Sequence, residues 1–223
     1  MITQSAGQTV RERLRAVNIY LITDSRPNVR PLEEFVARSI AGGVAMVQLR
    51  DKTLADRELL AAATSCAEVC RRNGALFIVN DRLDIALAAG ADGIHVGQED
   101  MPAAAVRKLA GDEFIVGLST HSADQIVAAQ DLAVDYIGVG PVHETPTKPG
   151  RPAVGLELVR YAASHSQLPF FAIGGLDAGN VAAVIAAGAR GVSVLRCISH
   201  ADDPEKAARD LLGQFPRRHE SPR

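Results

Sequence analysis

Short apolar runs rich in β-branched residues alternate along the chain with Ala- and Leu-rich stretches whose apolar residues recur every three to four positions. The runs have the length of strands, and the longer stretches have the spacing of amphipathic helices. Seven helical stretches lie between the eight runs, and an eighth, residues 204–214, follows the last run. The pattern predicts strands at residues 19–23, 46–50, 76–80, 93–96, 115–119, 136–139, 170–173 and 191–195.

This alternation predicts parallel strands joined by right-handed crossovers. Eight strand–helix units close into a (β/α)8 TIM barrel, whereas a doubly wound open sheet usually has about five or six strands. We therefore expect an α/β protein whose barrel covers residues 18–213 of a single domain, 1–223. We also expect a short helix within residues 1–15 beneath the barrel and a frayed polar tail at 216–223.

Composition and charge exclude several classes of protein. A formal net charge of −2 argues against nucleic-acid binding, and no apolar run approaches the ~18 residues of a membrane helix. The first 17 residues lack the apolar segment of a secretory signal. Cys66, Cys70 and Cys197 are too few for a disulfide framework and indicate reduced thiols in the cytoplasm. Cys66 and Cys70 are interpreted as small core residues.

Cationic and amide side chains end the second predicted strand. In a parallel barrel the reactive groups lie at the carboxyl ends of the strands. Gln48, Arg50 and Lys52 alternate there and share one face of an extended chain. Two cations at a barrel opening indicate an anionic ligand. A surface cluster in which these cations pair with Asp51 or Asp56 is the alternative.

Carboxylates follow the next two strands. Asn80 and Asp81 end the third predicted strand, and Asp100 follows the fourth. Mg²⁺ in proteins takes one or two carboxylates, waters and substrate phosphates. Beside the cations of the second strand, Asp81 and Asp100 therefore predict Mg²⁺ and a diphosphate. The alternative is that each aspartate caps a helix.

The fifth strand and the loop after the sixth carry further polar groups. Ser119 ends the fifth strand, and His121 is interpreted either as an acid/base or as a residue of the turn that follows. The loop 140–152 holds four of the eleven prolines, which is typical of a binding loop. Its side chains suited to an anion are Thr145, Thr147 and Lys148.

A second anion site is predicted after the seventh and eighth strands, near Gly174 and Gly175 and near Leu195 and Arg196. It suits a monophosphate. A diphosphate and a monophosphate at one opening suggest a joining reaction in which pyrophosphate leaves. The sequence shows no evident Ser-His-Asp or Cys-His set, so positioning and charge stabilisation would carry catalysis.

Taken together, these motifs resemble those of the thiamine-phosphate synthase family. They run in family order within residues 18–213: 48–52 (QLRDK), 80–81 (ND), 95–100 (HVGQED), 117–121 (GLSTH), 145–148 (TPTK) and 173–175 (IGG). The resemblance implies a (β/α)8 barrel. It also implies the condensation of 4-amino-2-methyl-5-hydroxymethylpyrimidine diphosphate with 4-methyl-5-(2-phosphoethyl)thiazole or its carboxylated form. Pyrophosphate is released, with CO2 from the carboxylated form.

The resemblance also implies roles for individual residues. The chemistry is dissociative, and Arg50, Lys52, Ser119 and Lys148 would act on the departing pyrophosphate. Many members carry a small hydroxyl residue where Arg196 stands. The implied ligand sets are Gln48, Arg50, Lys52, Asn80, Ser119 and Lys148 for the pyrimidine diphosphate, Asp81 and Asp100 for Mg²⁺, and Thr145, Thr147, Gly175, Leu195 and Arg196 for the thiazole phosphate.

Three other functions stay open. One is a related barrel that isomerises the thiazole, and another is a sensor that binds phosphate ligands without turnover. The third is a sugar-phosphate isomerase that would use His121 or His143 with an acidic residue. The expected partners are small-molecule substrates, with no nucleic acid and no membrane, and a homo-oligomer stays open.

Overall fold

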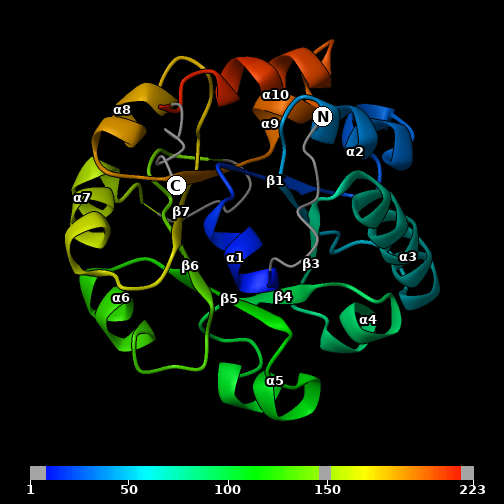
Figure 1. The fold of residues 1–223 in the computed structure, drawn as a ribbon, viewed down its shortest axis with the longest axis horizontal. Helices are drawn as coiled ribbons and strands as arrows, with labels where there is room; N and C mark the ends of the chain where they lie inside the picture. Colours follow the sequence, from blue (N-terminus) through cyan, green and yellow to red (C-terminus); the bar gives the residue numbers. More distant parts are fainter. Residues whose placement is uncertain (1–8, 146–151, 217–223) are drawn as a thin grey trace, which may run out of the picture.

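Parallel strands close into a barrel in which each strand pairs with its neighbours in chain order and β8 pairs with β1 (Figure 1). The computed structural model describes residues 9–145 and 152–216. The barrel prediction is confirmed, and three strands end one residue away from the predicted position. The strands are β1 (Ile19–Thr23), β2 (Met46–Leu49), β3 (Leu76–Asn80), β4 (Gly93–Val96), β5 (Ile115–Thr120), β6 (Tyr136–Val139), β7 (Phe170–Ile173) and β8 (Gly191–Val194).

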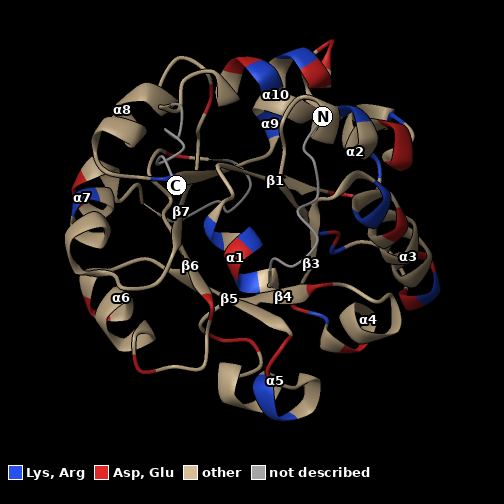
Figure 2. Ribbon diagram, viewed as in Figure 1, with Lys and Arg blue, Asp and Glu red and all other residues tan. Residues whose placement is uncertain are grey.

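Helices surround the barrel and carry charged residues of both signs (Figure 2). Within the described residues, no helix is long and apolar enough to cross a membrane. Residues 1–8 and 217–223, and with them most of the predicted tail, lie outside the described residues. The helices are α1 (Val10–Arg15), the short 3₁₀ helix η1 (Pro27–Val29), α2 (Leu32–Ala41), α3 (Asp56–Asn73), α4 (Leu83–Ala88), α5 (Ala103–Ala110), α6 (Ala123–Ala129), α7 (Gly155–His165), α8 (Val181–Ala186), α9 (Arg196–Ser199) and α10 (Pro204–Leu212).

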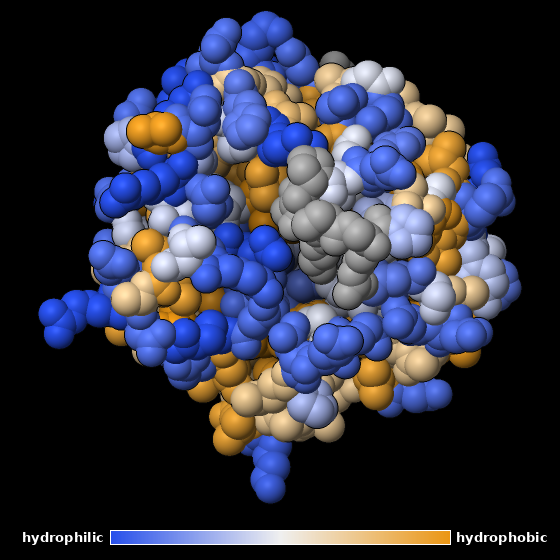
Figure 3. Space-filling model, turned by 180° about the vertical axis from the view of Figure 1, so that it is seen from behind, coloured by the Kyte–Doolittle hydropathy of each residue, from blue (hydrophilic) through white to orange (hydrophobic). Residues whose placement is uncertain are grey.

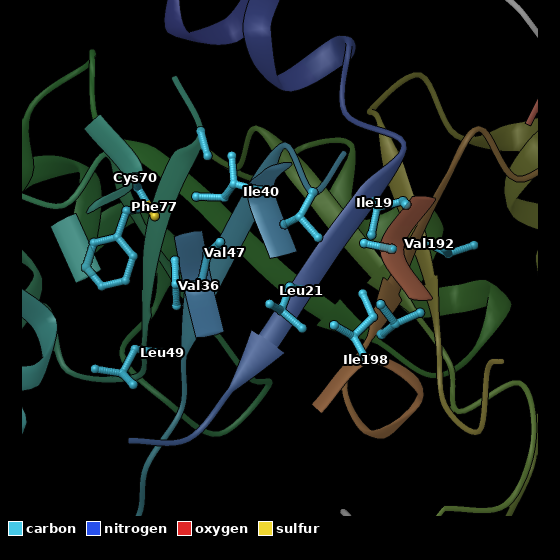
Figure 4. Close-up of a cluster of buried hydrophobic side chains, with 14 of the residues drawn as sticks. Ile19, Leu21, Val36, Ile40, Val47, Leu49, Cys70, Phe77, Val192 and Ile198 are labelled. Atoms are coloured by element: carbon cyan, nitrogen blue, oxygen red, sulfur yellow. The ribbon is translucent and has the colours of Figure 1, made fainter. Parts of the chain in front are cut away.

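One layer of the core lies between the strands and the helices. Successive strand residues point to opposite faces, so alternate residues of each strand face outwards. Figure 4 shows this layer around β1, β2 and β3, where Leu21, Val47 and Phe77 meet helix residues such as Val36. The predicted core role of Cys66 and Cys70 is confirmed, since both are fully buried here.

A second core cluster fills the inside of the barrel. Tyr20, Tyr136 and Phe171 point inwards, with ring centroids 5.3–5.8 Å apart and edge-on geometry. Glycines face these rings because a side chain would collide with them. A Cβ on Gly117 would lie 2.1 Å from Cζ of Tyr136, and one on Gly191 would lie 2.6 Å from Cδ1 of Phe171.

The amino-terminal end of the barrel is covered by α1, which lies over its centre in Figure 1. Thr9 caps this helix and forms a capping box with Glu12. Leu14 and Val17 are buried against the inner cluster. The opposite end carries the carboxyl ends of all strands, and hydrophilic residues surround its middle (Figure 3). Polar chemistry is therefore concentrated at this carboxyl-terminal end, which we call the mouth.

Replacing Gly93 with alanine tests how closely the strands pack. A Cβ there would lie 2.3 Å from the backbone oxygen and 2.5 Å from Cβ of Ile115, so the backbone must shift. We expect Gly93→Ala to lower the free energy of unfolding by about 3 kcal/mol in denaturant titrations. The control, Gly213→Ala, meets its nearest atoms at 3.5 Å and should be near neutral. Equal stability of the two variants would contradict the packing.

Candidate active site

A cavity of about 350 Å³ opens at the mouth. It is lined both by residues that the sequence predicted for the site and by others that it did not. The unpredicted lining residues include Tyr20, His95 and Ser193. The predicted site residues that the structure brings together around this cavity are Gln48, Arg50, Asn80, Ser119, Thr145, Gly175, Leu195 and Arg196.

Predicted residues outside that lining fall into two groups. Lys52, Asp81 and Asp100 lie at the ends of β2, β3 and β4 and contact one another rather than lining the cavity. Thr147 and Lys148 lie outside the described residues, so their roles stay predictions.

The structure does not show the pairing of Arg50 or Lys52 with Asp51 or Asp56 that the surface-cluster alternative required. Nζ of Lys52 lies 3.2 Å from Oδ2 of Asp81, with 62% of the lysine side chain exposed. Asp51 accepts hydrogen bonds from the hydroxyl groups of Ser25, at 2.6 Å, and Thr53, at 2.7 Å. Burial alone would raise the pKa of Asp51. The hydrogen bonds from these hydroxyl groups and from the backbone N–H groups of the same residues outweigh burial and lower the pKa. Asp56 pairs with Arg82 at 2.8 Å.

The interpretation of Asp81 and Asp100 as helix caps is wrong. Helix α4 begins after Arg82 and α5 begins after Pro102, and neither has a side-chain cap. Asp81 takes a left-handed backbone conformation with φ of 60°, and its N–H donates to the His95 carbonyl at 2.9 Å. Oδ2 of Asp100 accepts from the N–H of Gly97 at 2.7 Å. These turns bring the two carboxyl groups together.

The two carboxyl groups suit a divalent cation that also takes ligands from a substrate. Burial raises the pKa of Asp81, and the neighbouring Asp100 raises it further, while Lys52 acts in the opposite direction. Within the described residues, no group of three or more His, Cys, Asp or Glu side chains forms a metal site by itself. Mg²⁺ is commonly held by one or two carboxylates with waters and phosphate oxygens, so this pair fits it.

A hydrogen-bonded chain that the sequence did not predict crosses the barrel interior at the floor of the cavity. Nε2 of His95 lies 2.9 Å from Oγ of Ser119, and Nδ1 lies 3.0 Å from the hydroxyl of Tyr136. That hydroxyl lies 2.8 Å from the hydroxyl of Tyr20, which in turn accepts from Nε2 of Gln48. The signal in the sequence was the presence of Tyr and His within otherwise apolar strands.

The opposite side of the cavity is built by the loops after β6 and β7. The N–H of His143 donates to the Gly174 carbonyl at 3.0 Å, which ties the two loops together. Gly174 and Gly175 have φ values of 107° and 64°, and a Cβ on Gly175 would lie 2.7 Å from Cβ of His143. Only glycine allows this approach, which leaves backbone at the cavity wall.

His121 and Arg196 also lie in the wall of the cavity. Nδ1 of His121 contacts the Gly140 carbonyl at 2.6 Å, and the backbone N–H of His121 donates to Oε1 of Gln125. These contacts support the interpretation of His121 as a residue of the turn before α6. Arg196 is exposed and begins the short helix α9.

A family model and two named relatives agree on one family. A family model described as thiamine monophosphate synthase matches residues 19–198. The chain is 50% identical over 206 residues to a thiamine-phosphate synthase of Thermobifida fusca, covering 92% of this chain and 94% of the relative. It is 50% identical over 210 residues to that of Mycolicibacterium smegmatis, covering 90% and 92%.

A solved structure agrees with these relatives. The thiamine phosphate pyrophosphorylase from Pyrococcus furiosus superposes with a TM-score of 0.83 at 33% identity. The match covers 90% of this chain and 96% of that one.

Asp81→Asn tests the electrostatic state of the carboxyl pair. Because the pKa of Asp81 is raised in the folded protein, its ionisation lowers stability as pH rises above the ordinary value of 3.8. In EDTA at pH 7, we expect Asp81→Asn to have a higher Tm than the wild type. The difference should vanish below pH 3.8, where the carboxyl is protonated in both states. Asp131→Asn, an exposed control, should leave Tm unchanged. A lower Tm for Asp81→Asn at pH 7 would contradict the assignment.

Proposed function

This chain belongs to the thiamine monophosphate synthase family, and we propose that it condenses 4-amino-2-methyl-5-hydroxymethylpyrimidine diphosphate with thiazole phosphate and releases pyrophosphate. It is a transferase of thiamine biosynthesis, as its relatives are named. The thiazole partner is 4-methyl-5-(2-phosphoethyl)thiazole or its carboxylated form, which also loses CO2. The observation that carries the proposal is that predicted ligands of both substrates line one cavity.

The size and lining of the cavity support two small substrates. A volume of about 350 Å³ lies within the usual range of ligand pockets. Gln48, Arg50 and Asn80 lie at the ends of β2 and β3. Gly175 and Leu195 follow β7 and β8. The pyrimidine diphosphate would bind on the first side and the thiazole phosphate on the second, where Thr145 and Arg196 also line the wall.

Asp81 and Asp100 would hold Mg²⁺, together with oxygen atoms of the diphosphate. When bound there, Mg²⁺ would neutralise negative charge on the diphosphate. Lys52, at 3.2 Å from Asp81, adds a second positive charge beside the same carboxylates. With Mg²⁺ bound, the metal and the lysine would together exceed the charge of the two carboxylates, which would leave this edge of the site positive toward the diphosphate.

The proposed chemistry is dissociative. The bond between the pyrimidine methylene carbon and the diphosphate oxygen breaks, and pyrophosphate takes the electron pair. The thiazole nitrogen then forms the new bond with the resulting pyrimidine-stabilised cation. Arg50, Lys52 and Lys148 would stabilise the departing charge, and Ser119 would donate to it. No covalent intermediate with the protein is required, because the two substrates are held next to each other.

The first test is turnover by the purified protein with both substrates and Mg²⁺, with product converted to fluorescent thiochrome. Product that requires both substrates is expected. Turnover of the thiazole phosphate alone would support the isomerase, and binding without turnover would support the sensor. Arg50, Lys52, Asp81 and Asp100 are all present, which favours the synthase over the isomerase. The cytoplasmic location stays a prediction.

Removing either carboxylate of the proposed metal site should abolish turnover. We expect Asp81→Ala and Asp100→Ala to fall below ~1% of the wild-type kcat/KM at saturating Mg²⁺, because charge on the diphosphate is no longer neutralised. Circular dichroism should show an unchanged fold. Wild-type rates in both variants would exclude the metal assignment.

Removing the lysine should cost far more than the loss of an exposed ion pair. We expect Lys52→Ala to lower kcat/KM by ~100-fold, since a charge that stabilises pyrophosphate is lost. The matched control, Lys206→Ala, removes an exposed lysine paired at 2.6 Å with Asp210 on α10. It should change kcat/KM by less than about threefold. A similarly small change for Lys52→Ala would show that its role is structural.

A further inference from the structure

The hydrogen-bonded chain at the floor of the cavity has polar side chains of the site at both ends. Gln48 and Ser119 line the cavity, and they are joined through Tyr20 and His95, which also line it, and through the buried Tyr136. Tyr20 and Gln48 are 1% exposed, Tyr136 is fully buried and Ser119 is 8% exposed. The contacts of this chain therefore operate largely inside the protein, where each hydrogen bond is strong and each misplaced proton is costly.

Starting from its first link, the bonds of this chain take one direction when each hydroxyl accepts one hydrogen bond and donates one. Nε2 of Gln48 is a donor, so the Tyr20 hydroxyl accepts from it and gives its own hydrogen to Tyr136. In this arrangement Tyr136 accepts from Tyr20 and gives its own hydrogen to Nδ1 of His95.

The remaining links follow in the same direction. An uncharged imidazole has one N–H and one lone pair, so Nε2 of His95 carries the hydrogen and donates to Oγ of Ser119. The Ser119 hydroxyl is left to donate its hydrogen elsewhere. Reversing the Gln48 amide would reverse every one of these bonds.

The rings that carry the chain have little freedom to rearrange. Tyr136 packs edge-on against Tyr20 and Phe171, with centroids 5.8 and 5.4 Å apart. The ring also fills the space beside Gly117, where a Cβ would lie 2.4 Å from the Tyr136 hydroxyl. Burial raises the pKa of both tyrosines, so each keeps the single hydrogen that the chain needs. The Ser119 carbonyl accepts from Nε2 of Gln98 at 2.6 Å, which fixes the other end.

We propose that Tyr20, Tyr136 and His95 are positioning residues that fix the hydrogen-bond polarity of the cavity, so that Gln48 presents its carbonyl oxygen and Ser119 presents its hydroxyl hydrogen to the substrate. This inference rests on the proposed function. An amide held through Nε2 offers its oxygen as acceptor, whereas the reversed amide offers only N–H groups. The cavity then selects a pyrimidine with an exocyclic amino group over the corresponding oxo compound.

The same polarity assigns a role to the contact between His95 and Ser119. With its hydrogen on Nε2, His95 donates to Ser119 and does not remove the serine proton. Ser119 is then a hydrogen-bond donor to an oxygen of the diphosphate ester and does not act as a nucleophile. Tyr136 occupies the place beside Nδ1 where a serine hydrolase has a carboxylate.

The first experiment compares the amino substrate with its 4-oxo analogue. Tyr20→Phe removes the partner of Gln48, which lets the amide rotate. We expect the preference for the amino substrate, as a ratio of kcat/KM values, to fall by ~10-fold or more. Phe171→Leu is the control, because it loosens packing against both tyrosines and removes no hydrogen-bonding group. Its preference should change by less than about threefold.

Tyr136→Phe tests the Ser119 end of the chain. We expect it to lower kcat with a smaller effect on the amino preference, and to cause no further loss in a Ser119→Ala background. An unchanged preference in Tyr20→Phe, an equal loss in Phe171→Leu, or additive effects of Tyr136→Phe and Ser119→Ala would each overturn the proposal.

A second measurement needs no activity. Nitrogen-15 NMR of histidine-labelled protein distinguishes the two neutral tautomers, and the His95 signals are identified by their loss in His95→Gln. We expect the wild type to carry the hydrogen on Nε2, and Tyr136→Phe to populate the other tautomer. A hydrogen on Nδ1 in the wild type would overturn the polarity. If wild-type protein turns over neither pyrimidine, the proposed function fails, and these spectra still decide the polarity.

Discussion

The inside of the barrel has room for only a few large side chains, and the rest of the structure depends on how it is filled. Tyr20, Tyr136 and Phe171 fill it together with apolar side chains such as Met46 and Ile78, and glycines on neighbouring strands leave the space that the rings need. Had the rings been phenylalanine alone, the Gln48 amide and Nδ1 of His95 would lose the hydroxyl groups that they contact. The two hydroxyl groups add polarity inside the barrel without leaving a buried group unpaired, because each hydroxyl contacts the next member of the chain.

The charged side chains of the site lie in a different place from the buried hydrogen-bonded chain. Lys52, Asp81 and Asp100 meet beyond the ends of three neighbouring strands, where water and ligands reach them. Neutral hydrogen bonds thus operate deep in the barrel, and ionic groups operate at its rim. This division suits a substrate with an uncharged ring and a charged diphosphate, since burying the ionic groups would carry a large desolvation penalty.

The sequence predicted the barrel because apolar runs and helical stretches alternate without interruption. The ends of β2, β5 and β8 differ from prediction by one residue, since pairing with a neighbouring strand decides where a ladder stops. The meeting of Asp81 and Asp100 was predictable because β3 and β4 are neighbours in chain order. The chain from Gln48 to Ser119 was not, because it requires the register of five strands and the closure of β8 on β1.

Helix α1 affects how ligands enter and leave the cavity. Among the described residues, Leu14 and Val17 fill the amino-terminal end of the barrel interior, and the cavity lies at the opposite end, at the mouth. A ligand seated on Gln48 and Ser119 would therefore exchange with solvent on the side of the mouth, where the second substrate site is also proposed. A helix that lines neither site thereby limits the path that both ligands take.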